Sequence, residues 1–178
     1  MSVENKLQLI IKPLEREDID DVDIIAQRAY GQHHWSKEAF YSELSNNLAK
    51  YFVAKTVNNK LIGFAGYWGI IDEAHVTTIA VDPDYRRQYV GEVLLVTMLQ
   101  GCYKEMFKYL TLEVRESNLP AIKLYEKYGF KSFGVRKGYY QDNNENALIM
   151  WTENIFWDKF KCMYEENLAK LKDLVDIK

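Results

Sequence analysis

The chain has 178 residues, of which 48% are hydrophobic and 28% are charged, with a formal net charge of −3. This length fits one domain with a full core, and the charge gives no general attraction to nucleic acid or to an anionic membrane. The longest nearly unbroken apolar run, residues 61–71, is shorter than the roughly 20 residues that a membrane-spanning helix needs.

The N-terminal segment lacks the long apolar stretch of a cleavable signal, so we expect a cytoplasmic protein. Cys102 and Cys162 are far apart and form no CxxC motif, which indicates neither a disulfide framework nor a zinc site. The three histidines also lack the spacing of metal ligands, and we expect no metal.

The first half of the chain alternates between strand and helix patterns. Residues 7–14 read as a strand, and residues 15–30 read as a helix because apolar residues recur at helical spacing. A short helix begins after Ser36, a favourable N-cap, and is expected to bury Ala39, Phe40 and Leu44. Strands are predicted at residues 51–57, 61–70 and 74–81.

The second half continues the alternation. A well-buried helix is predicted from Val90 to Phe107, followed by a strand at 109–114. A short helix is predicted next, with Asn118 as its N-cap and Gly129 past its end, and then a hairpin of strands 130–140 and 145–152. Residues 154–178 have the pattern of one amphipathic helix. We therefore predict an α/β (α+β) domain over residues 1–152, and a helical extension over 153–178 that packs on this domain or on a partner.

Two strand-to-helix junctions, at residues 81–90 and 113–119, face one cleft if their strands are neighbours. A helix N-terminus with Arg86 and Arg87 beside it favours an anion. Glu113 ends its strand on the polar face, and Asn118 and Tyr125 share one side of the next helix. The spacing alone indicates an anion-binding domain. It leaves open that Glu113 is a solvated strand end and that Tyr125 is a core aromatic residue.

Three segments carry a more specific signal: HVTTIAVDPDYRRQYVG, LTLEVRESNLPAIKLYEKYGF and RKGYYQDNNENALIM. Over about residues 8–152 the chain resembles the GNAT family of N-acetyltransferases and, within it, the RimI-type ribosomal-protein N-terminal alanine acetyltransferases. The resemblance implies the GNAT fold, a mixed central sheet of about six to seven strands flanked by helices. The extra C-terminal helix lies outside the resemblance.

The resemblance implies acetyl-CoA as co-substrate. By position, the backbone of Ile79 and Val81 would hold the pantetheine arm, and Asn118 would also contact it. The pyrophosphate loop would comprise Arg86, Arg87, Gln88, Val90, Gly91 and Glu92.

Tyr89 stands where the family's loop has its first glycine. If Tyr89 keeps a helical backbone with its ring in solvent, little binding is lost. If the ring displaces the loop and one charge-assisted hydrogen bond is lost, binding weakens about 10- to 100-fold.

Glu113 aligns with the family's general base and Tyr125 with its general acid, while Tyr139, Tyr140 and Trp35 would lie near the acceptor. The implied acceptor is the N-terminal α-amino group of a protein, with a ribosomal protein expected. A small amine or a lysine side chain is an alternative acceptor. The chain could also be a non-catalytic binding module if Tyr89 abolishes cofactor affinity. No nucleic-acid or membrane partner is expected.

Overall fold

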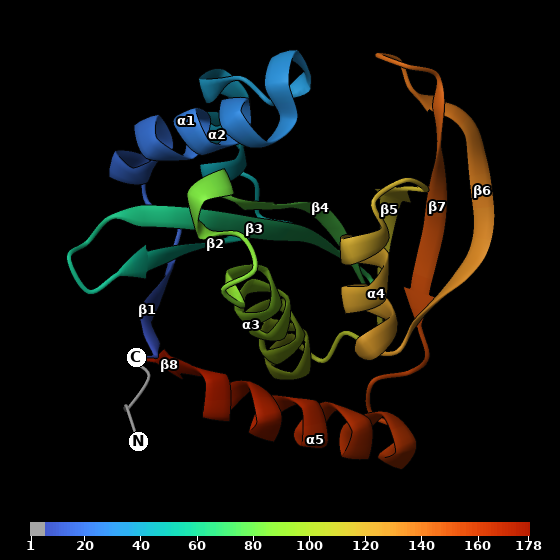
Figure 1. Ribbon diagram of the computed structural model, residues 1–178. Helices are drawn as coiled ribbons and strands as arrows, with labels where there is room; N and C mark the ends of the chain where they lie inside the picture. Colours follow the sequence, from blue (N-terminus) through green and yellow to red (C-terminus); the bar gives the residue numbers. More distant parts are fainter. Residues whose placement is uncertain (1–5) are drawn as a thin grey trace.

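A single mixed sheet forms the centre of the computed structural model, which describes residues 6–178; the first five residues of the predicted domain lie outside it. Within these residues the sheet has eight strands in the order β6-β7-β5-β4-β3-β2-β1-β8 (Figure 1). Their bounds are β1 Leu7–Pro13, β2 Ala49–Thr56, β3 Leu61–Ile70, β4 Glu73–Val81, β5 Tyr109–Arg115, β6 Phe130–Tyr140, β7 Glu145–Thr152 and β8 Val175–Ile177. The predicted fold class is confirmed, with β8 as an additional strand.

Helices cover both faces of the sheet. They are α1 Ile19–Tyr30, α2 Lys37–Leu44, α3 Val90–Glu105, α4 Leu119–Lys127 and α5 Asp158–Leu174, with short 3-10 turns at Arg16–Asp18, Gly31–His33 and Pro83–Tyr85. The first two helices lie on one face, and α3 and α4 lie on the other, above α5 (Figure 1). In the described part of the chain, no helix combines the length and the apolarity that crossing a membrane requires.

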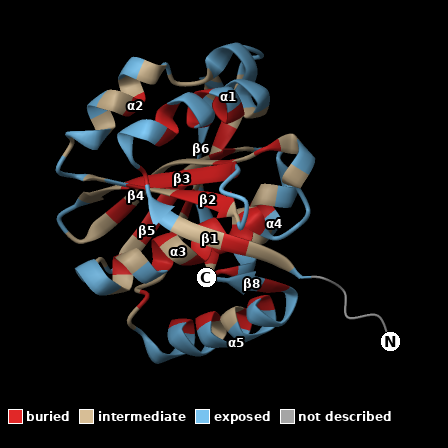
Figure 2. Ribbon diagram, turned by 90° about the vertical axis from the view of Figure 1, so that its left-hand side faces the viewer, coloured by how far each residue is buried: buried red, intermediate tan, exposed pale blue. Residues whose placement is uncertain are grey.

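The apolar residues form one cluster on each side of the sheet. The larger cluster contains α3, which is buried on most sides as predicted, and the smaller one joins α1 and α2 to β2 and β3 (Figure 2). The Ser36 hydroxyl accepts a hydrogen bond from the Ala39 N–H, so the predicted cap of α2 is confirmed. Phe40 is buried as expected, but Leu44 is 39% exposed because it falls at the frayed end of this short helix.

The C-terminal extension is a helix followed by a strand. Phe160, Tyr164 and Leu171 of α5 join the larger cluster. The helix ends at Leu174, where Val175–Ile177 pair in parallel with Leu7–Leu9 of β1. The prediction of one helix to residue 178 is therefore wrong at its end. The free edge of β1 offers backbone partners that an amphipathic pattern does not reveal.

Candidate active site

The sheet opens between β4 and β5. These parallel strands pair only at Glu73–His75 and Tyr109–Thr111. Beyond this point, β4 stays with β3 as far as Val81, and β5 stays with β7 as far as Arg115. The carboxyl ends of two neighbouring strands therefore separate, which is where α/β sheets bind ligands.

Backbone groups of β4 face this opening. Asp82 N–H donates to the Ile62 carbonyl at 2.8 Å, and the antiparallel register then places Ala80 opposite Phe64. Hydrogen-bonded and non-hydrogen-bonded pairs alternate in such a ladder. Ile79 and Val81 belong to the non-hydrogen-bonded pairs of β3 and β4, so their N–H and C=O groups point away from β3 and toward β5.

A second set of free backbone groups lies at the start of α3. The side chain of Asp82 accepts from Asp84 N–H at 3.0 Å and pairs with Arg28 at 2.6 Å, which holds the end of β4. In the described chain, no N–H group from Arg87 to Glu92 has a hydrogen-bond acceptor. Free N–H groups at a turn and a helix N-terminus form an anion-binding site.

Tyr89 does not have the helical backbone of the first arrangement considered from the sequence. Its backbone is left-handed, with φ 65° and ψ 2°, and Arg87 also has a positive φ of 60°. Its side chain is 41% exposed and makes no hydrogen bond within the described residues. The expected helical backbone is wrong because the position requires a positive φ, which glycine adopts at little cost. Gly91 lies against Val81, where an added Cβ would make only an ordinary contact at 3.6 Å.

The charged residues of this loop differ in availability. Arg86 and Arg87 are exposed, and neither forms an ion pair within residues 6–178. Gln88 donates to the Asp84 carbonyl at 3.3 Å. The carboxylate of Glu92 is buried and engaged by Lys127 and by the Tyr128 hydroxyl at 2.7 Å. Of Glu92, only the backbone N–H is left to bind a ligand.

Glu113 lies on β5 and Tyr125 on α4, the helix that follows β5. Glu113 forms an ion pair with Arg136 of β6 at 3.2 Å. Tyr125 is only 9% exposed, and burial raises the pKa of its phenol, with further contributions from the nearby phenols of Tyr30 and Tyr140. Burial raises the pKa of Tyr140 to about 12, opposed by Arg115 and supported by the charge of Glu113 among other neighbours.

Arg115, to which the sequence analysis assigned no role, fixes the tip of the β6–β7 hairpin. Its guanidinium pairs with Asp142 at 2.9 Å and Glu145 at 3.1 Å and lies over the Tyr140 ring, 3.8 Å from its centroid. Hydrogen bonds from the Ser117 side chain and N–H lower the pKa of Glu145 to about 2. The Tyr139 ring lies edge-on to that of Tyr140, with centroids 5.1 Å apart.

Asn118, Trp35 and Tyr30 come from three different parts of the chain. Asn118 caps α4 by accepting from Ala121 N–H at 3.3 Å, at the carboxyl end of β5. Trp35 packs on Phe40 and Tyr51 in the smaller cluster, so a contact with the acceptor stays a prediction. Tyr30, at the end of α1, reaches the open edge of β4 and was missed, because the last residue of an amphipathic helix carries no distinctive signal.

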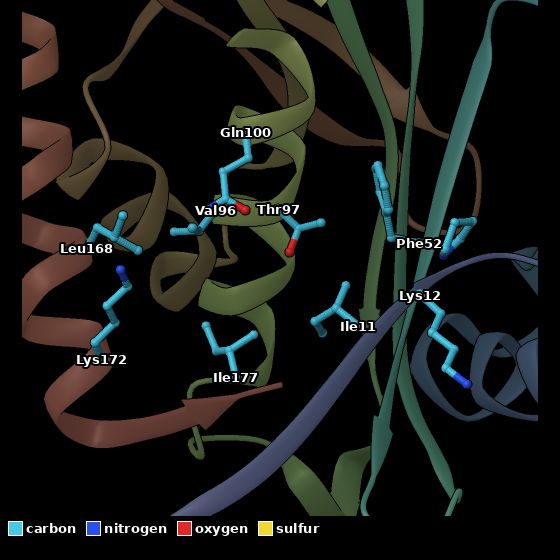
Figure 3. A pocket seen from close by; sticks show the side chains of 10 residues that line it. Ile11, Lys12, Phe52, Val96, Thr97, Gln100, Leu168, Lys172 and Ile177 are labelled. Carbon is cyan, nitrogen blue, oxygen red and sulfur yellow. The ribbon is translucent and has the colours of Figure 1, made fainter. Parts of the chain in front are cut away.

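A separate hollow of about 410 Å³ lies between β1, α3 and the C-terminal extension. Leu168 and Lys172 of α5 line it on one side and Ile11 and Phe52 of β1 and β2 on the other, with Val96 of α3 between them (Figure 3). It contains none of the residues predicted for the site.

Comparisons with known proteins agree with this geometry. A model of the family described as "Acetyltransferase (GNAT) family" matches residues 17–130. The putative [ribosomal protein bS18]-alanine N-acetyltransferase of Bacillus subtilis is 39% identical over 146 residues, which are 82% of this chain and 96% of the relative. The [ribosomal protein bS18]-alanine N-acetyltransferase of Escherichia coli K12 is 39% identical over 142 residues, covering 79% and 94%.

Solved structures show the same similarity. The crystal structure of the ribosomal-protein-S18-alanine N-acetyltransferase from Escherichia coli has a TM-score of 0.75 and 38% identity, with 82% of this chain and 94% of that chain covered. Ard1 from Thermoplasma volcanium has a TM-score of 0.74 and 28% identity, with 82% and 97% covered.

Proposed function

Because this chain belongs to the GNAT family of acetyltransferases, we propose that it acetylates the N-terminal α-amino group of a protein, namely the N-terminal alanine of ribosomal protein bS18. Family membership makes the chain an acetyl-CoA-dependent N-acetyltransferase rather than a non-catalytic module. The assignment of the acceptor rests on one observation, the 39% identity to one putative and one named bS18-alanine N-acetyltransferase over almost their whole length.

The site has the groups that acetyl-CoA needs. The N–H groups from Arg87 to Glu92 and the guanidinium groups of Arg86 and Arg87, which have no partner within residues 6–178, suit a diphosphate. The outward-facing N–H groups of Ile79 and Val81 and the C=O group of Val81 suit an arm that contains amides, while the Ile79 C=O group accepts from the Tyr30 hydroxyl. When bound, acetyl-CoA supplies the acetyl group as a thioester.

Glu113 is the proposed general base and Tyr125 the proposed general acid. The carboxylate accepts the proton of the acceptor's amine through a water molecule, and its ion pair with Arg136 keeps it on the β6 side of the opening. The buried phenol of Tyr125 stays protonated at neutral pH because its pKa is raised, so it can donate a proton to the departing sulfur. Tyr139 and Tyr140 line the acceptor side of the hairpin.

An α-amino group suits this chemistry better than a lysine side chain. Only a neutral amine attacks, and the ordinary pKa is about 7.7–8.0 for an α-amino group but about 10.4 for lysine. Near neutral pH, the neutral fraction of the α-amino group is therefore larger by roughly a hundredfold or more.

The acceptor is tested by incubating the protein and acetyl-CoA with peptides that differ only in their first two residues, including the N-terminus of bS18. The site of acetylation is then located by mass spectrometry. We expect acetyl on the terminal nitrogen, with the fastest rate for the bS18 peptide. Acetylation confined to lysine side chains, or to small amines such as spermidine, would overturn the proposal.

The catalytic roles are tested by Glu113→Gln and Tyr125→Phe. We expect each to lower kcat at least tenfold, within the range that positioned acid–base groups supply, while acetyl-CoA binding by calorimetry stays within twofold. Glu116→Gln is the matched control, because Glu116 is exposed and, in the described part of the chain, its carboxylate hydrogen-bonds only to the Asn146 side chain. Wild-type kcat in Glu113→Gln would exclude Glu113 as the base.

A further inference from the structure

Tyr30 connects α1 to the opening between β4 and β5. Its hydroxyl donates to the Ile79 carbonyl at 2.6 Å and shares a second hydrogen bond with the Thr78 hydroxyl at 3.1 Å. The residue is 42% exposed, so its ring lies at the surface while its oxygen reaches the strand.

The Ile79 carbonyl is an unusual partner for a side chain. In a continuous sheet, an outward-facing carbonyl of β4 would accept from the N–H of the next strand. Here β5 has already separated from β4, so the Tyr30 hydroxyl takes the place of the missing strand partner. The phenol oxygen therefore lies at the edge of the opening itself.

The same oxygen lies on the β4 side of the opening, across from β5, which carries Glu113. Burial raises the pKa of the Tyr125 phenol, and Tyr30 and Tyr140 contribute to this shift. Burial also raises the pKa of Tyr30, although its hydrogen bonds and the charge of Arg86 oppose this. Tyr30 therefore stays protonated at neutral pH and is no candidate for a base.

We propose that Tyr30 binds the acceptor's α-amino group: its phenol oxygen accepts a hydrogen bond from an amine N–H in place of the one from the Thr78 hydroxyl, while its own O–H remains on the Ile79 carbonyl. This inference rests on the proposed acetylation of protein N-termini.

Three considerations support this role. A phenol that already donates to a carbonyl is polarised and becomes a better acceptor. Holding one N–H of a neutral primary amine limits its rotation and directs the nitrogen lone pair, which favours a productive approach. No proton leaves Tyr30, so the roles of Glu113 and Tyr125 are unchanged.

The test compares Tyr30→Phe with the wild-type protein on an N-terminal peptide that the wild type acetylates. We expect KM for the peptide to rise about 3- to 10-fold, the loss of one hydrogen bond. The dissociation constant of acetyl-CoA should stay within twofold, and the pH profile of kcat should be unchanged. Tyr41→Phe, the same substitution on the neighbouring α2, should leave all three quantities unchanged.

A des-amino peptide, in which hydrogen replaces the α-amino group, separates a direct contact from a general change in the site. As a competitive inhibitor it should bind the wild type and Tyr30→Phe equally well. The inference is overturned if KM of Tyr30→Phe equals that of the wild type, or if Tyr30→Phe weakens the des-amino peptide or acetyl-CoA as much as the peptide substrate. If the wild type acetylates no peptide terminus, the proposed function itself is wrong.

Discussion

The left-handed backbone of Tyr89 makes the loop before α3 a measurable source of strain. A residue with a Cβ in this conformation costs about 1–2 kcal/mol relative to a right-handed one. Tyr89 has a φ of 65° and no hydrogen bond from its side chain within the described residues. Glycine would relieve this strain but would lose more conformational freedom on folding, at a cost of about 0.5–1 kcal/mol.

Two substitutions separate the backbone from the ring. Tyr89→Ala removes the ring but keeps the strain, whereas Tyr89→Gly removes both. We expect Tyr89→Gly to be more stable than Tyr89→Ala by about 0.5–1 kcal/mol, the difference between the two terms above. For a chain of this size, the thermal midpoint should then differ by roughly 1–4 °C, which calorimetry resolves.

The same pair tests whether the ring obstructs the diphosphate. The left-handed backbone leaves the N–H groups from Arg87 to Glu92 free, as a glycine would. We therefore expect the dissociation constant of acetyl-CoA, measured by titration calorimetry, to stay within about threefold of the wild type in both variants. A 10- to 100-fold tightening in both would show that the ring blocks the loop. Equal stability of the two variants would refute the inference that the left-handed backbone at position 89 is strained.

Three further predictions concern stability and the hairpin. Leu171→Ala should lower the free energy of unfolding by about 2–5 kcal/mol, measured by urea denaturation, because Leu171 is fully buried where α5 meets the domain. The contribution of Glu145 to the free energy of unfolding should be complete above the unfolded-state pKa of about 4.3 and should be lost as the pH falls toward the folded-state pKa of about 2. Glu145→Gln should therefore flatten this part of the pH–stability curve. Arg115→Met should raise KM for the peptide and not for acetyl-CoA, because it releases the hairpin that carries Tyr139 and Tyr140; equal rises would contradict this role.

The sequence was most informative where a local rule decides the outcome. Ser36 and Asn118 predicted two helix starts because a side-chain cap depends only on neighbouring residues. The predictions that Leu44 is buried and that Val175 is helical were wrong, because each outcome depends on what lies beside the segment in space. For Val175, the free edge of β1 overrides the helical pattern.

The predicted site shows the same division. A position-specific motif identified the acetyltransferase family, and it also predicted Glu113, Tyr125 and the loop before α3 as the site, since these residues lie within long matching segments. The contacts of Arg115 and Tyr30 could be recognised only in the tertiary structure, because their partners are 27 to 49 positions away in the chain.

Periodicity, caps and motifs in the sequence thus determined the order of the elements and the type of chemistry. Tertiary structure decided the separation of β4 from β5, the outward-facing carbonyl of Ile79 and the left-handed backbone of Tyr89. The physical reason is that strand register and long-range hydrogen bonds are selected by the packing of the whole sheet, whereas a cap or a helical period is selected within a few residues.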